Sequence, residues 1–99
     1  MKPYDWDDFK NERMVRRRKV SFKEAVAAIE TGQLLDIIDH PNPGKYPGQK
    51  IYILVLKNYV HIVPFTEEED RIVLETIIPS RKFTKRYLSG GKDEKNQVG

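Results

Sequence analysis

The residues best suited to chemistry lie close together near the C-terminal end of the sequence. Four cations surround two aromatic side chains there: Arg81, Lys82, Phe83, Lys85, Arg86 and Tyr87. Residues 72–78 are mostly apolar and predict a strand that stops at Pro79. Ser80 can then cap a helix reaching Leu88, because its hydroxyl accepts from a free backbone N–H of the first turn. Cations clustered where a strand meets a helix favour binding of a polyanion. A terminal helix that is simply exposed to solvent would carry the same residues.

A second basic stretch lies near the N-terminus. Seven cations and one acid fall between Lys10 and Lys23, within a chain whose net charge is only +3. Four of these cations are consecutive: Arg16, Arg17, Arg18 and Lys19. Neither basic segment has the broad apolar face of an interfacial helix. A phosphate-rich partner therefore fits the sequence better than a membrane does.

The composition excludes several kinds of site. The 99 residues include no cysteine, so disulfides and thiolate metal sites are excluded. The two histidines, His40 and His61, are not spaced with acids as zinc ligands would be. No Gly-rich phosphate loop or nucleophile–base set is present, and we expect neither a cofactor nor a metal. We also expect a cytoplasmic protein, because no apolar run approaches a membrane span and the N-terminal residues do not form a signal peptide.

Two helices should precede the strands. Asp5 can cap the first helix. Asp8, three residues on, then lies in the first turn, where an acid interacts favourably with the helix dipole. Trp6 and Phe9 are its expected core anchors. The crowded like charges of residues 16–19 predict that this helix ends there.

A second helix has clearer signals at both ends. Ser21 and Glu24 form a capping box, in which each side chain satisfies a backbone donor of the other residue. Gly32 is the expected left-handed stop. The apolar stripe follows the helical period: Phe22, Ala25, Val26 and Ile29.

The clearest β signal is a hairpin from Ile51 to Phe65. Lys57-Asn58 would form a two-residue turn, since asparagine tolerates the positive φ of a primed turn. This register pairs Leu56 with Tyr59. Alternation then predicts an aliphatic core face: Ile51, Ile53, Val55, Val60 and Ile62. The opposite face is aromatic and mixed: Tyr52, Leu54, Leu56, Tyr59, His61 and Val63.

Shorter signals flank the hairpin. Residues 34–39 predict a strand, and residues 40–49 a loop because they contain three prolines and two glycines. Residues 66–70 predict an acidic turn, and residues 71–79 a last strand. Helices followed by strands favour an α+β class, with two N-terminal helices packed on a four-stranded, mainly antiparallel sheet and a short basic C-terminal helix. Residues 1–88 would form a single domain, and residues 89–99 a disordered tail with nothing to bury.

Several of these segments, taken in order, resemble a known family. The segments are Tyr4-Asp5-Trp6-Asp7 with Lys10, Val20-Ser21-Phe22-Lys23-Glu24-Ala25, Asp39-His40, and Thr76-Ile77-Ile78-Pro79-Ser80-Arg81-Lys82-Phe83-Thr84-Lys85-Arg86-Tyr87. Together they resemble the BrnT-like toxins, which are the ribonuclease partners of type II toxin–antitoxin pairs. Each motif is weak alone. Their order and spacing over residues 4–88 carry the resemblance.

The resemblance implies a RelE-like fold and metal-independent endoribonuclease activity on mRNA. It also implies neutralisation by a small DNA-binding antitoxin, with a heterotetramer as a possible assembly. One departure stands out. Members of the family usually have Lys-His-Gly before the VSF motif, where this chain has Arg17-Arg18-Lys19, and an arginine cannot replace a histidine as a titrating base. The arginine that follows the last strand is kept as Arg81.

RNA cleavage without metal needs a base for the 2′-OH, cations for the phosphate and an acid for the leaving oxygen. The catalytic candidates are therefore Arg81, Lys82, Lys85, Tyr87, His61 and His40. Arg81 is the preferred phosphate ligand because a guanidinium fork matches phosphate oxygens. Candidates for contacting RNA are Arg16, Arg17, Arg18, Lys19, Tyr52, Tyr59 and Arg86. Structural roles remain open for the tyrosines and histidines, and the run 16–19 could instead be a solvated helix end or face the antitoxin.

Two functions therefore remain. The first is an endoribonuclease toxin. The alternative is a catalytically silent RNA- or protein-binding module related to such toxins, which the missing Lys-His-Gly favours.

Overall fold

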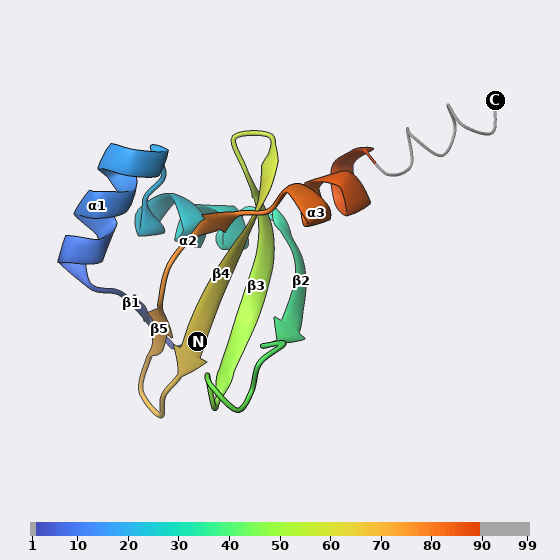
Figure 1. Cartoon of the computed structure of the whole chain (residues 1–99). Coiled ribbons are helices and arrows are strands. Elements are labelled where there is room, and N and C mark those ends of the chain that lie inside the picture. The colour runs from blue at the N-terminus through green and yellow to red at the C-terminus, as the bar shows by residue number, and fades with distance from the viewer. Residues whose placement is uncertain (1, 90–99) are drawn as a thin grey trace.

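The computed structural model describes residues 2–89 and shows two helices followed by a twisted sheet and a terminal helix (Figure 1). The elements along the chain are β1 (Tyr4–Asp5), α1 (Asp8–Arg18), α2 (Phe22–Glu30), β2 (Leu34–Asp39), β3 (Gln49–Leu56), β4 (Tyr59–Glu67), β5 (Ile72–Leu74), β6 (Ile78–Pro79), α3 (Arg81–Thr84) and a π-helical turn η1 (Lys85–Ser89). The predicted α+β class is confirmed. Of the predicted tail, residues 90–99 fall outside the described residues.

The strands form one sheet of six strands rather than the predicted four. Their order is β1-β5-β4-β3-β2, and β6 pairs with β4. β1 is parallel to β5, and the other pairings are antiparallel. The sequence prediction missed β1 because it made Asp5, a residue of this strand, the cap of the first helix. The helix instead begins at Asp8, where the Asp7 carboxylate caps it by accepting from the Lys10 N–H at 3.0 Å.

The predicted last strand is broken into β5 and β6 opposite Pro64 of the neighbouring strand. The Pro64 carbonyl accepts from the Glu75 N–H at 2.8 Å, so the backbone of this residue faces the last strand. The N–H and C=O of a strand residue point to the same neighbour, and proline has no N–H. One donor of the ladder is therefore missing here, and the pairing resumes with the register shifted by one residue, from Phe65–Leu74 to Ile62–Ile78. The chain leaves the sheet after Leu74 and rejoins it at Ile78.

The β3–β4 hairpin matches its prediction. Lys57 and Asn58 both have positive φ, 53° and 61°, as a primed two-residue turn requires. Leu56 pairs with Tyr59, and the register continues without a break to Gln49 and Thr66. The hairpin therefore fixes which side chains share each face of the sheet.

The aliphatic face of the hairpin forms a core cluster as predicted, but this cluster is the smaller of two. The larger core cluster lies on the mixed face, where Leu54 and Leu56 pack with Phe22 and Ala25 of α2. A smaller cluster on the opposite face centres on Ile51, Ile53 and Val60. Both faces are thus covered. Alternation shows which residues share a face, but not which face the helices cover.

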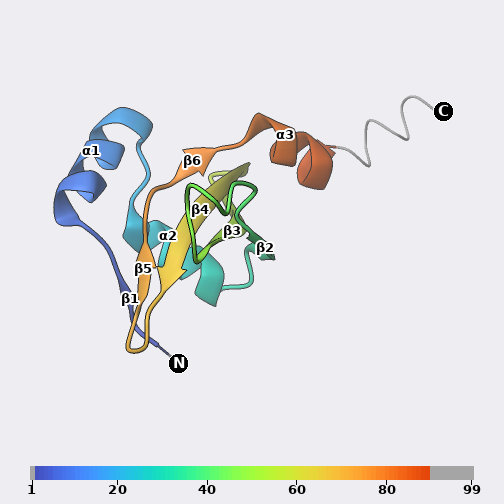
Figure 2. The ribbon, with the colours of Figure 1, turned by 60° about the horizontal axis from the view of Figure 1, so that its bottom comes forward.

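The two N-terminal helices differ in how deeply they are buried. The capping box of α2 is confirmed, with Ser21 and Glu24 each accepting from the other's backbone N–H. In α1 only Met14 is buried, and this helix lies beside the sheet, next to β5 (Figures 1 and 2). Trp6 stacks on Phe22 at 5.7 Å between ring centroids. Phe9, predicted as a core anchor, is 80% exposed; the helix is capped at Asp7, two residues later than predicted, so Trp6 precedes it and the helical spacing no longer places Phe9 beside Trp6.

Candidate functional site

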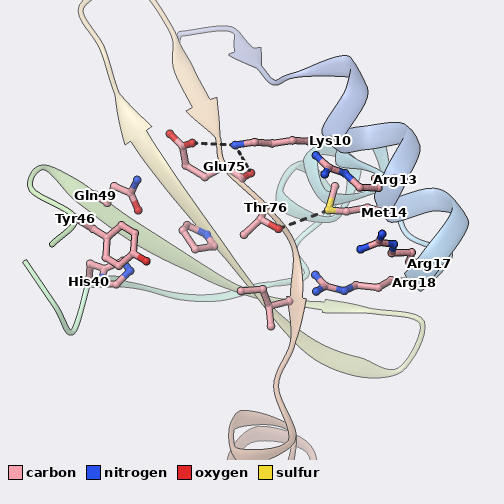
Figure 3. A pocket seen from close by; sticks show the side chains of 12 residues that line it. Lys10, Arg13, Met14, Arg17, Arg18, His40, Tyr46, Gln49, Glu75 and Thr76 are labelled. Carbon is pink, nitrogen blue, oxygen red and sulfur yellow. Dashed lines mark hydrogen bonds and ion pairs between the residues drawn. The ribbon is translucent and has the colours of Figure 1, made fainter.

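A groove of about 540 Å³ lies between α1 and the loop before β3 (Figure 3). Its floor includes Pro64 and Ile78, which alternation places on the sheet face opposite α2. One wall is the basic side of α1. The other comes from the loop of residues 40–49. The groove therefore joins segments that are far apart in the sequence.

Two cations on the basic wall hold α1 against the segment between β5 and β6. The Lys10 ammonium lies 3.7 Å from the Glu75 carboxylate and donates to the Glu75 carbonyl at 3.4 Å. The Arg18 guanidinium donates to the carbonyl of Ile77. These contacts supply hydrogen-bond donors to two backbone carbonyls in the segment between β5 and β6. The same residues that carry charge thus position the helix.

Two other cations on this wall, Arg13 and Arg17, are free to bind a ligand. Both line the groove and are exposed, and neither has a hydrogen-bond or ion-pair partner among residues 2–89 (Figure 3). Their i,i+4 spacing places them on one side of α1. Two adjacent guanidinium groups without a carboxylate partner form a site for an anion such as phosphate.

The opposite wall presents a pair of stacked aromatic rings. His40 and Tyr46 lie 4.4 Å apart between centroids at an interplanar angle of 30°. The His40 Nδ1 accepts from the Asn42 N–H at 3.0 Å, so a ring in this arrangement carries its hydrogen on Nε2 and can donate it in a hydrogen bond to a ligand. The Lys45 ammonium lies 5.4 Å from the Tyr46 centroid.

The loop that carries this pair is tied by its own backbone. The Tyr46 N–H donates to the Asn42 carbonyl, and the Gln49 N–H donates to the Tyr46 carbonyl. Gly48 adopts a φ of 77°, which lets the chain turn back into β3 without strain. Residues 40–48 are thus an ordered turn that presents rings to the groove.

The structure divides the predicted site residues among several places. Arg17, Arg18 and His40 line the groove. Arg16 does not line it and lies 4.0 Å from Glu12. Lys19 ends α1 in the left-handed conformation, with φ 60°. The run of four cations therefore splits, and only part of it faces the groove.

The predicted C-terminal cluster lies on α3 and η1, outside the groove lining. Ser80 caps α3 as predicted, accepting from the Phe83 N–H at 3.1 Å. Phe83 packs on the smaller core cluster, and the Thr84 hydroxyl accepts from the Val60 N–H at 2.8 Å. The basic and tyrosine side chains of this segment are exposed: Arg81, Lys82, Lys85, Arg86 and Tyr87.

Three predicted residues lie on the sheet face opposite the groove. Tyr52 is 5% exposed and stacks on Phe65 at 3.9 Å, so the prediction that it stacks on a base is wrong for this structure. Burial raises the pKa of its hydroxyl, and the neighbouring Tyr4 raises it further. Tyr59 is half-buried and contacts the His61 ring edge-on.

His61 is buried on the same face and does not reach the other catalytic candidates. Its Nδ1 lies 2.9 Å from the Tyr59 carbonyl. Burial lowers the pKa of His61, and the charges of Lys57 and Arg18 lower it further, against the effect of the backbone contact. A neutral, buried ring fits a structural role.

Sequence reasoning missed several residues that the groove brings together: Lys10, Arg13, Tyr46, Gln49 and Glu75. The spacing of cations in the sequence could have indicated two of them, Lys10 and Arg13. Lys10, Arg13 and Arg17 follow i,i+3,i+7 spacing and so share a side of a helix. No comparable signal exists for Tyr46, because its place depends on the fold of its loop.

Comparisons with models of protein families, with curated proteins and with solved structures find no match for this chain. Within residues 2–89 no group of three or more His, Cys, Asp or Glu side chains could hold a metal ion. The helices of this part of the chain are all too short or too polar to span a membrane.

Proposed function

We propose that this protein is an endoribonuclease toxin that cleaves mRNA without a metal ion, held in check by a small DNA-binding antitoxin. The observation that carries the proposal is the groove. Arg13 and Arg17, which have no ion-pair partner among residues 2–89, lie on one wall, and the stacked His40 and Tyr46 lie on the other. This arrangement combines phosphate binding, hydrogen-bond donation and base stacking. The resemblance to BrnT-like toxins, within which a RelE-like fold is the expected architecture, supports the same reaction.

The groove residues can supply the steps of RNA cleavage. Attack of a ribose 2′-oxygen on the adjacent phosphorus needs charge stabilisation at the phosphate, which Arg13 and Arg17 provide. The proton of the 2′-OH is taken by a base, and the leaving 5′-oxygen receives a proton from an acid. The Nε2–H of His40 can donate a hydrogen bond to the phosphate or to the leaving 5′-oxygen, which stabilises the charge that develops there.

The basic C-terminal helix extends the RNA-binding surface. The chain passes from Ile78 on the groove floor to Arg81 at the start of α3 within three residues. The exposed cations of α3 and η1 can follow the phosphates of an RNA strand beyond the groove. Arg81 remains the preferred contact among them because of its bidentate geometry.

A catalytically silent RNA-binding module is the second candidate. The observation that favours it is the dispersal of the expected catalytic residues. His61 is buried on one face, His40 lies in the groove, and Arg81 lies on α3. Arg18, at the position where relatives usually have histidine, is engaged with the Ile77 carbonyl.

One experiment separates the two candidates. The chain is expressed from an inducible promoter in a bacterial host, as wild type, as Arg13→Ala/Arg17→Ala, as His40→Ala and as Lys23→Ala. Lys23 is an exposed cation on α2, away from the groove lining, and controls for loss of charge. Growth and total RNA are followed after induction.

The toxin hypothesis requires growth arrest and RNA degradation with wild type and Lys23→Ala, and relief in the two groove variants. Purified wild type must also cleave single-stranded RNA in the presence of EDTA. RNA binding without cleavage or arrest would instead establish the silent module. Absence of both binding and cleavage would reject both candidates.

A further inference from the structure

We infer that the groove holds one unpaired nucleotide, whose base stacks on the His40–Tyr46 pair and is read at its edge by Gln49, while Arg13 and Arg17 bind an adjacent phosphate. This inference rests on the proposed function and names the substrate class of the same site. It assigns Gln49 as the residue that determines base specificity.

The aromatic pair is suited to accept a third ring. Tyr46 is 36% exposed although His40 already stacks on it. The nearby Lys45 side chain is exposed, and a lysine ammonium on its four-carbon stem can turn from the tyrosine to a phosphate. Stacking of unpaired bases on aromatic side chains is the common mode of single-stranded RNA recognition, since every base has a π face.

Gln49 is held beside this stack by its own backbone. Its N–H donates to the Tyr46 carbonyl, and its carbonyl accepts from the His40 N–H, both at 3.3 Å. Its side-chain amide lines the groove and has no hydrogen-bond partner among residues 2–89 (Figure 3). An amide offers an adjacent donor and acceptor, which is the pattern that reads a base edge.

The dimensions and charges of the groove fit one nucleotide. A volume of about 540 Å³ falls within the range of sites that enclose a small ligand. The basic wall and the aromatic wall face each other, so a base and its phosphate can be bound together. A base inside a duplex could not reach Tyr46, because its faces are covered by neighbouring base pairs.

The test measures binding of short labelled oligoribonucleotides by fluorescence anisotropy. The oligonucleotides are 2′-O-methylated, which removes the 2′-OH nucleophile and prevents cleavage during the titration. All have the same uridine flanks and differ at one central position, which carries A, C, G, U or an abasic sugar.

Wild type should bind a base-containing oligonucleotide on the order of five- to a hundredfold more tightly than the abasic one. Tyr46→Ala and Tyr46→Leu should both bind the base-containing and the abasic oligonucleotides with similar affinity. The leucine variant retains apolar bulk in case alanine disturbs the loop. Gln49→Ala should keep the ratio but bring the affinities for the four bases together. Phe9→Ala removes an exposed aromatic ring of α1 that does not line the groove and should behave as wild type.

Failure of this inference can be told apart from failure of the proposed function. Equal binding of base-containing and abasic oligonucleotides would overturn the stacking site, while RNA binding itself would stand. A base preference unchanged in Gln49→Ala would overturn the assigned specificity residue. If wild type binds none of the oligonucleotides, both the inference and the proposed function are rejected.

Discussion

The guanidinium of Arg18 donates a hydrogen bond to the carbonyl of Ile77, and this contact joins the end of α1 to the chain between β5 and β6. Ile77 is fully buried, so its carbonyl lies where water has little access. Arg18 thus has a structural role in addition to carrying charge beside the groove.

Replacement of Arg18 should therefore destabilise the fold. Arg18→Met keeps most of the aliphatic stem and removes the donor, and we expect a loss of about 1–3 kcal/mol in the free energy of unfolding, typical of a hydrogen bond to a charged group. Urea denaturation measures this change. Arg16→Met, on the same helix but 79% exposed, serves as the comparison and should stay within about 0.5 kcal/mol of wild type. Equal effects of the two substitutions would contradict the structural role of Arg18.

Two neighbouring arginines should differ in RNA binding. Arg17 lines the groove without a partner in the described chain, whereas Arg16 lies outside the groove lining. Arg17→Ala should lower RNA affinity about equally for all sequences and reduce the slope of log affinity against log salt by about 1. Arg16→Ala should have the smaller effect on both quantities. Anisotropy titrations at several salt concentrations give both values, and an equal slope change in the two variants would place the phosphate contact elsewhere.

His61 should make stability depend on pH. The folded state lowers its pKa, so the unfolded chain binds the proton more readily. The contribution of His61 to the free energy of unfolding is fully present above the unfolded pKa of about 6.5. It is lost as the pH falls through the lower pKa of the folded state. His61→Gln removes the titrating ring, and its unfolding free energy should fall less steeply between pH 6.5 and pH 5 than that of wild type. Parallel pH profiles of the two proteins would show that His61 is not the group responsible.

The two phenylalanines near the N-terminus should differ sharply in their effect on stability. Phe22 is completely buried between α2 and the sheet, and Phe22→Ala should cost about 3–5 kcal/mol. Phe9 is 80% exposed, and Phe9→Ser should change stability by no more than about 0.5 kcal/mol. Thermal or urea unfolding of both variants checks the assignment. A large loss from Phe9→Ser would mean that another surface covers this ring.

Local signals predicted those parts of the fold that depend on a few neighbouring residues. The capping box at Ser21 and the turn at Lys57-Asn58 specify their own backbone geometry, and the structure contains both. The register of β3 and β4 follows from that turn. Ser80 as the cap of the terminal helix is a further example.

The errors arose where distant segments decide the outcome. Both faces of the hairpin are apolar enough to be buried, so the pattern could not show that α2 covers the face with Leu54. The site was harder still to predict. His40 and Arg17 were candidates for separate reasons, but nothing local indicated that a loop and a helix 23 residues apart form the two walls of one groove.

Pro64 links the architecture of the sheet to the shape of the groove. Pairing with β4 shifts register by one residue there, since Phe65 pairs with Leu74 on one side and Ile62 with Ile78 on the other. The carbonyls of Glu75 and Ile77, to which Lys10 and Arg18 donate, both belong to this shifted segment. An irregularity of the sheet thus supplies the two acceptors that fix α1 at the edge of the groove.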